Sequence, residues 1–227
     1  MYRILLLPGG ASPVGSQQYK QAYAVIEEEA ARRNFECRTV AYPGQNGRAS
    51  GLLNYPRSLK TTLQVCREYK PHWLIGRSFG CAVAAGALGV DEEWRSGCQG
   101  AALWGPCLRE TIYRVWPTVE SREREVDEFE TRGTYLSLDY FQDYPAIDEL
   151  INFSKSNLRL VRGSEDFFNS NEDLGYLAAI HGQAQPNYKR DVVVIEGLKH
   201  TVTRGDVSPE LLSRYFDSLF CFSITGG

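Results

Sequence analysis

The sequence lacks any long hydrophobic run. None of its 227 residues lies in a stretch that approaches the roughly 18 consecutive apolar residues of a membrane-spanning helix. The beginning, MYRILLLPGG, has one arginine and a short apolar run, which is too small for the core of a signal peptide and lacks a cleavage site. We therefore expect a cytoplasmic protein with no membrane partner.

An excess of charge of one sign is also missing. The chain has 25 Lys and Arg against 28 Asp and Glu, a formal net charge of −3, and the two signs interleave. No basic run is long enough to indicate binding to nucleic acid or to an anionic membrane surface. With 43% hydrophobic and 23% charged residues, the composition is typical of a globular protein, and we expect one domain over residues 1–227.

Clusters of cysteine and histidine are absent as well. The six cysteines are scattered without a C-x-x-C pair, and only three histidines could add ligands, so we expect no metal site. Without an export signal, disulfides are not expected, and free thiols usually lie buried. The cysteines are Cys37, Cys66, Cys81, Cys98, Cys107 and Cys221.

Short apolar runs alternate with helical patterns along the chain, and no internal repeat is present. This alternation predicts an α/β fold with a mostly parallel central sheet and helices on both faces. The expected strands are 2–7, 35–42, 72–76, 99–105, 157–163 and 190–197. The expected helices are 17–33, 56–69, one from Phe79 onward, 171–182 and 208–220.

Residues 109–156 interrupt this alternation. They are charged and rich in aromatics, and they are too long for a plain crossover between strands. We favour a small helical cap, with an exposed helix over 121–132, because long insertions are often functional; an extended crossover is the alternative. The cap aromatics, Trp116 and Tyr140 among them, could line an apolar acyl pocket or form the cap's own core.

The pentapeptide GRSFG, residues 76–80, follows an expected strand and precedes an expected helix. That context predicts a nucleophile elbow, a tight turn that raises the Ser78 hydroxyl at the carboxyl edge of the sheet. Gly76 and Gly80 would relieve the crowding of such a turn. The backbone N–H of Phe79, at the start of the helix, would then point at a developing oxyanion.

A serine nucleophile needs a base, and three histidines are available. His72 opens the strand that leads to the elbow, at the opposite edge of the sheet, and His181 ends an expected helix. His200 follows strand 190–197 at the carboxyl edge, where α/β sheets place their sites. We therefore predict His200 as the general base for Ser78.

The orienting acid should come from a loop at the same edge. Asp166 and Glu165 both follow strand 157–163, and Asp166 is our choice; Glu110 is a reserve candidate. The resulting order of nucleophile, acid and base is the one typical of α/β-hydrolases.

Two further roles are predicted beside the nucleophile. The second oxyanion donor is assigned to the N–H of Gly10, with Ala11 as its neighbour, although the PGG sequence could be only a tight turn. Arg77 could contact an anionic group of the substrate, or lie outward in a salt bridge.

Five short motifs, called anchors below, follow one another along the chain. Their order and residues resemble the α/β-hydrolase superfamily, in particular small capped serine esterases. The resemblance implies a sheet of eight or slightly fewer strands, a cap after the sixth strand, and a serine hydrolase that needs no cofactor. The chain departs from the pattern at Pro8, where relatives often have histidine, and at Ala41-Tyr42, near which they often have aspartate. The anchors are PGG at 8–10, PGQNG at 43–47 followed by Ser50, GRSFG at 76–80, GSED at 163–166 and GLKH at 197–200.

The expected activity is hydrolysis of a carboxylic ester of a small molecule, through a Ser-His-Asp triad and an acyl-enzyme. A thioesterase or acyltransferase acting on a carrier-bound or CoA-bound acyl group is one alternative. A catalytically silent binding protein with a hydrolase fold is another, against which the full set of Ser78, Asp166 and His200 argues.

Overall fold

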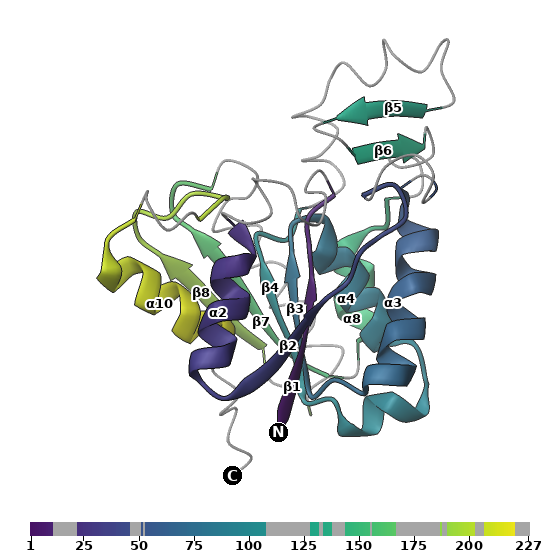
Figure 1. Cartoon of the computed structure of the whole chain (residues 1–227), viewed down its shortest axis with the longest axis horizontal. Coiled ribbons are helices and arrows are strands. Elements are labelled where there is room, and N and C mark those ends of the chain that lie inside the picture. Colours follow the sequence, from purple (N-terminus) through teal and green to yellow (C-terminus); the bar gives the residue numbers. More distant parts are fainter. Residues whose placement is uncertain are drawn as a thin grey trace.

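The structure is a computed structural model in which a sheet lies between two layers of helices (Figure 1). It describes residues 1–10, 22–45, 51, 53–107, 128–131, 134–137, 144–154, 156–166, 187, 190–202 and 207–220.

Six parallel strands form the central sheet of the described chain, in the order β2-β1-β3-β4-β7-β8. The inner strands β3 and β4 are buried along their whole length, because helices cover both faces of the sheet. The prediction of a parallel α/β sheet is thus confirmed. The strands are β1 (Tyr2–Leu7), β2 (Phe35–Thr39), β3 (Trp73–Arg77), β4 (Gly100–Trp104), β7 (Asn157–Gly163) and β8 (Arg190–Ile195).

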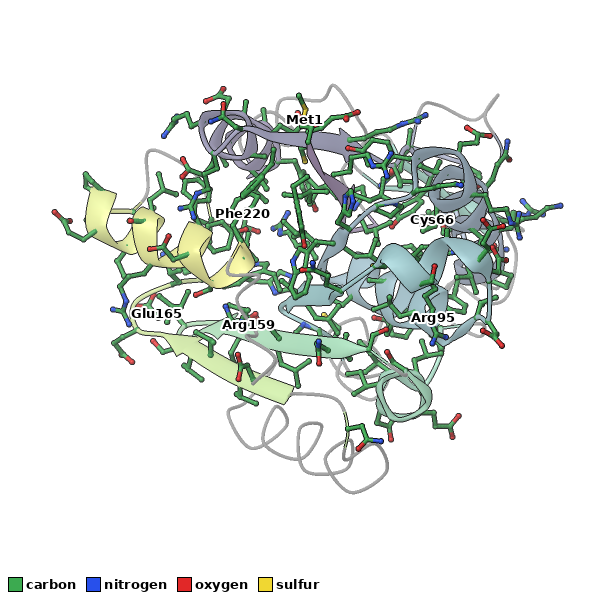
Figure 2. All side chains as sticks on the ribbon, turned by 90° about the horizontal axis from the view of Figure 1, so that it is seen from below. Met1, Cys66, Arg95, Arg159, Glu165 and Phe220 are labelled. Atoms are coloured by element: carbon green, nitrogen blue, oxygen red, sulfur yellow. The ribbon has the colours of Figure 1, made fainter. Side chains whose placement is uncertain are left out.

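The helices divide between the two faces and enclose two apolar cores. One face is covered by α2 (Ala24–Arg32) and α10 (Pro209–Phe220), with Phe220 among its buried side chains (Figure 2). The other is covered by α3 (Tyr55–Tyr69), α4 (Phe79–Gly89) and α8 (Ile147–Phe153), with Cys66 buried on that side. A short 3₁₀ helix, η2 (Glu93–Gly97), precedes β4.

Helix α4 is the central element of its layer. Ten of its eleven residues are buried, because it packs on β3 and lies beside both α3 and α8. Its alanines and glycines keep the helix thin enough for this position. The neighbouring α3 has a conventional start, in which the Asn54 side chain accepts a hydrogen bond from the Arg57 N–H.

The insertion between β4 and β7 differs from the helical cap that we expected. Strands β5 (Glu128–Thr131) and β6 (Thr134–Ser137) form an antiparallel pair beyond the carboxyl ends of the sheet strands (Figure 1). The expected helix over 121–132 is therefore wrong at 128–131, where the backbone pairs residue by residue with 134–137 as a strand. Later in the insertion, Ile147 and Ile151 of α8 are buried in the α/β core.

Some expected elements lie partly or wholly outside the described residues. Helix α2 begins at Ala24, so the expected helix at 17–33 is described only in its second half. The expected helix at 171–182 lies outside entirely. In the described ranges, no helix is long and apolar enough to cross a membrane.

Candidate active site

Ser78 occupies the tight turn between β3 and α4. Its backbone has φ 52° and ψ −119°, a conformation that residues with a side chain rarely adopt, and its N–H donates to the Trp104 carbonyl at 2.9 Å. Although Ser78 is the N-cap of α4, its hydroxyl makes no capping hydrogen bond. The hydroxyl is therefore not used to cap the helix that it precedes.

Two glycines make this turn sterically possible. A Cβ atom at Gly76 would lie 2.7 Å from the Gly80 carbonyl oxygen and 2.9 Å from the Cys81 Cα atom. A Cβ atom at Gly80 would overlap the backbone of Leu7 and lie 2.7 Å from the Pro8 carbonyl oxygen. Real Cβ atoms essentially never come closer than 3.0 Å, so both positions require glycine.

His200 and Asp166 form a buried pair at the same edge of the sheet. His200 Nδ1 lies 2.9 Å from Asp166 Oδ2, and the two residues are only 7% and 4% exposed. The neighbouring Glu165 is exposed, so its carboxylate does not take this place. The backbone of Gly105, at φ 59°, passes so close that a Cβ there would be 2.8 Å from His200 Nδ1.

The environment of His200 favours a neutral imidazole. Burial lowers the pKa of His200 below the ordinary histidine value, and the Arg77 cation adds to that lowering. The hydrogen bond and negative charge of Asp166 act in the opposite direction but do not prevail. A neutral imidazole whose Nδ1–H donates to Asp166 leaves Nε2 able to accept a proton.

Trp104 connects the serine turn to the histidine loop. Its carbonyl accepts from the Ser78 N–H, and its indole N–H donates to the His200 carbonyl at 2.9 Å. Among the described residues, the polar contact recorded for Ser78 Oγ is with Cys107 Sγ at 3.7 Å. Through Trp104, Ser78 and His200 thus lie at the same edge of the sheet. Proton transfer from Ser78 to His200 stays a prediction.

The loop after β1 lies directly against the serine. A Cβ atom at Gly9 would be 3.5 Å from Ser78 Cβ, and the Gly9 N–H donates to the Tyr23 hydroxyl at 2.6 Å. Gln45 fixes the same loop, because its Nε2 donates to the carbonyls of Gly9 and Gly10 at 3.0 and 3.3 Å. The Gly9 N–H is thus engaged, and the predicted donor role stays with Gly10.

Phe79 is the first residue of α4, before the point where N–H groups find acceptors within the helix. Its role as the other oxyanion donor stays a prediction. Its ring packs edge-on to Tyr42, with ring centroids 5.7 Å apart, and lies 6.1 Å from the ring of Tyr144. The Tyr144 hydroxyl donates to the carbonyl of Cys107, and all three rings belong to the buried core on the α4 side of the sheet.

Arg77 points inward and does not lie outward in a salt bridge, which was one of the two expectations. It is only 6% exposed, and its guanidinium donates to the Tyr23 hydroxyl, to Thr201 Oγ1 and to the His200 carbonyl. A contact of Arg77 with the substrate stays a prediction, but an outward salt bridge does not fit this buried position. The physical reason is the alternation of β3, which places Arg77 on the same buried face as Ile75.

Sequence reasoning missed Tyr23, Gln45 and Thr201. Gln45 had a signal, since it lies within the PGQNG anchor, whereas Tyr23 and Thr201 contact the site only through the fold. Four candidates, Glu110, Trp116, Tyr140 and His181, lie outside the described residues.

His72 lies at the opposite edge of the sheet, as expected, where its Nδ1 accepts from the Arg3 N–H. In the part of the chain that the structure describes, no group of histidine, cysteine and carboxylate side chains could hold a metal ion. The five described cysteines are free thiols.

Comparisons with known proteins bear on the fold. No protein-family model matches the sequence, and no curated protein does either. Several solved structures are similar, each at low sequence identity. Est1E from Butyrivibrio proteoclasticus, solved with ferulic acid bound, has a TM-score of 0.68 at 13% identity and covers 95% of this chain and 86% of its own.

Two other structures give the same result. The esterase domain of a Rhodothermus marinus protein has a TM-score of 0.61 at 17% identity, covering 99% of this chain and 85% of its own. The N-formylmaleamic acid deformylase Nfo from Pseudomonas putida has a TM-score of 0.59 at 15% identity, covering 88% and 86%. The resemblance drawn from the sequence is confirmed at the level of architecture: the protein has the α/β-hydrolase fold.

Proposed function

We propose that the protein is a serine hydrolase that cleaves a carboxylic ester of a small molecule through an acyl-enzyme. One observation carries the proposal: a buried His200–Asp166 pair lies at the sheet edge where a strained turn presents Ser78. A buried carboxylate behind a neutral imidazole, beside a serine on an elbow, is the arrangement that activates a hydroxyl.

The first half of the reaction forms the acyl-enzyme. His200 Nε2 removes the Ser78 proton while Ser78 Oγ attacks the carbonyl carbon, and the carbonyl electron pair moves to its oxygen. The N–H groups of Phe79 and Gly10 stabilise this oxyanion. The imidazolium, stabilised by Asp166, then protonates the alcohol as the carbon–oxygen bond breaks.

The second half regenerates the enzyme. His200 removes a proton from water, the resulting hydroxide attacks the acyl carbon, and the Ser78 oxygen leaves with the proton returned by His200. The lowered pKa of His200 keeps the imidazole neutral in the resting enzyme, which both halves require.

Ester cleavage is the preferred reaction because the Rhodothermus marinus domain, an esterase domain by name, shares the architecture over nearly the whole chain. The deformylase shows that the same architecture accompanies cleavage of another acyl bond. A thioesterase or acyltransferase therefore stays the second candidate, and comparing turnover of matched thioesters and oxoesters separates the two.

Replacement of Ser78 tests the proposal. We expect Ser78→Ala to abolish hydrolysis of a short p-nitrophenyl ester and covalent labelling by a fluorophosphonate probe, since no other residue supplies the attacking oxygen. Ser96→Ala is the matched control, because Ser96 is an exposed serine on η2 whose hydroxyl donates to the Glu93 carbonyl. Full turnover by Ser78→Ala would refute the assignment, and a folded wild-type protein that takes up no probe would favour the silent alternative.

A further inference from the structure

The Arg77 guanidinium connects three segments near the candidate site, which are the elbow, the start of α2 and the loop after β8. Arg77 itself immediately precedes Ser78 on the elbow. Its Nη1 donates to the Tyr23 hydroxyl at 2.8 Å, and its Nη2 donates to Thr201 Oγ1 at 2.7 Å. The two ends of one planar group thus hold segments from the beginning and the end of the chain.

The Tyr23 contact reaches the loop that carries the predicted oxyanion donor. The Tyr23 hydroxyl accepts from Arg77 and also from the Gly9 N–H at 2.6 Å. The guanidinium in addition lies over the Tyr23 ring, 5.0 Å from its centroid, where a cation is attracted to the ring face. A displacement of Arg77 would therefore be transmitted through Tyr23 to Gly9 and its neighbour Gly10.

The Thr201 contact reaches the loop of the predicted base. Thr201 follows His200 directly, and the His200 carbonyl lies 3.4 Å from the same Nη2 of Arg77. The Trp104 indole N–H donates to that carbonyl as well. With the His200 backbone fixed on this side and its ring held by Asp166 on the other, the direction of Nε2 is determined.

The charge of Arg77 acts on the same imidazole. A guanidinium stays protonated even when it is buried, and it disfavours a second positive charge on His200. Besides Asp166 and Tyr23, the described ionisable side chains near Arg77 are Tyr215 on α10, Cys81 on α4 and Cys107 after β4. Burial raises the pKa of Tyr215, of Cys81 and of Cys107, so all three stay neutral near pH 7.

We propose that Arg77 is a positioning residue that clamps the oxyanion loop, through Tyr23, to the base loop. The proposal rests on the proposed function for its kinetic consequences. The clamp and the charge of Arg77 separate experimentally, because lysine keeps the charge but has no planar fork with which to hold Tyr23 and Thr201 together. Methionine removes both the charge and the fork.

The test compares Arg77→Lys, Arg77→Met and Thr201→Val with the wild-type enzyme. Thr201 is exposed, so Thr201→Val removes one bond of the clamp with little effect on folding. The matched control is Arg159→Met, which removes another largely buried arginine from the sheet (labelled on β7 in Figure 2), one that pairs with Asp191. Each variant is measured by ester kinetics over pH and by NMR titration of the His200 ring, assigned with His200→Gln.

We expect Arg77→Lys and Thr201→Val to lower kcat about 10- to 100-fold with an unchanged KM, because the catalytic groups lose their alignment. The acid limb of kcat/KM should stay in place in both, since the charge remains. Arg77→Met should lower kcat similarly and move the limb, and the His200 titration, to higher pH. Arg159→Met should keep kcat within about twofold.

Wild-type kcat and wild-type titration of His200 in all three variants would overturn the proposal, as would a loss of thermal stability alone. If Arg77→Met does not fold, the kcat values of Arg77→Lys and Thr201→Val decide whether the clamp exists. If the wild-type protein neither turns over esters nor takes up the probe, the proposed function fails. The NMR titration then still decides whether the charge of Arg77 lowers the pKa of His200.

Discussion

Replacing Gly80 by alanine should disturb the candidate site through the backbone alone. Gly80 is the second residue of α4, and its Cα faces the end of β1, which leads into the loop of Gly9 and Gly10. An added Cβ would overlap the Leu7 carbonyl oxygen and lie 2.6 Å from the Leu7 carbonyl carbon. All of these are backbone atoms in the centre of a sheet, so no side chain can rotate away.

The size of the effect follows from these distances. Moving the Leu7 carbon from 2.6 Å to the 3.0 Å limit for Cβ contacts requires 0.4 Å of separation between α4 and β1, and the overlap with the Leu7 carbonyl oxygen, which lies closer, requires more. Overpacking of a core typically costs about 1 to 3 kcal/mol of unfolding free energy. Because misplacement by about 1 Å can cost about 100-fold in rate, we expect turnover to fall at least about tenfold.

Urea unfolding followed by tryptophan fluorescence measures the first quantity, since Trp73 and Trp104 are fully buried. The rate of fluorophosphonate labelling at Ser78 measures the second. Gly89→Ala is the matched control in the same helix, because a Cβ there meets no atom within 4 Å. That variant should gain up to about 1 kcal/mol from helix propensity. Native stability and native labelling of Gly80→Ala would refute the reasoning.

Two further predictions follow from the buried groups. Asp166→Asn should lower kcat about 10³- to 10⁴-fold and move the acid limb of the pH profile lower, because the carboxylate that raises the pKa of His200 is lost. The exposed neighbour provides the control, since Glu165→Gln should leave kcat within about twofold (Glu165 is labelled in Figure 2), and equal effects of both changes would contradict the assignment. Burial raises the pKa of Cys37, Cys98 and Cys107 to about 12, so iodoacetamide at pH 8 should alkylate them about 10³-fold more slowly in the native protein than after unfolding. Peptide mass spectrometry measures this, and rapid labelling of native Cys107 would show that its surroundings are open.

The sequence was informative where local pattern and topology coincide. Ser78, Asp166 and His200 each follow a short apolar run, and parallel strands bring their carboxyl ends to one edge whatever the intervening chain does. The elbow could also be read locally, since only glycine at 76 and 80 permits so close a passage of strand and helix.

Contacts between distant segments could not be read in the same way. Arg77 is held by Tyr23, 54 positions before it, and by Thr201, 124 positions after it. No local sequence pattern predicts either contact. Its direction, in contrast, could have been inferred, because in a strand it shares a face with Ile75. The strand at Glu128–Thr131 was misjudged because its flanking charges resemble an exposed helix.

The turn at Ser78 has a consequence for how the chain should change if its chemistry were dispensable. A non-glycine residue at a positive φ outside the left-handed helical region costs about 1 to 3 kcal/mol of stability. The Ser78 hydroxyl does not offset this cost by capping α4, because it makes no capping hydrogen bond. Glycine at this position would relieve that strain without leaving a cavity. Folding alone would therefore favour glycine at position 78, so the serine lowers the stability of the chain for a reason that the packing of the turn does not supply.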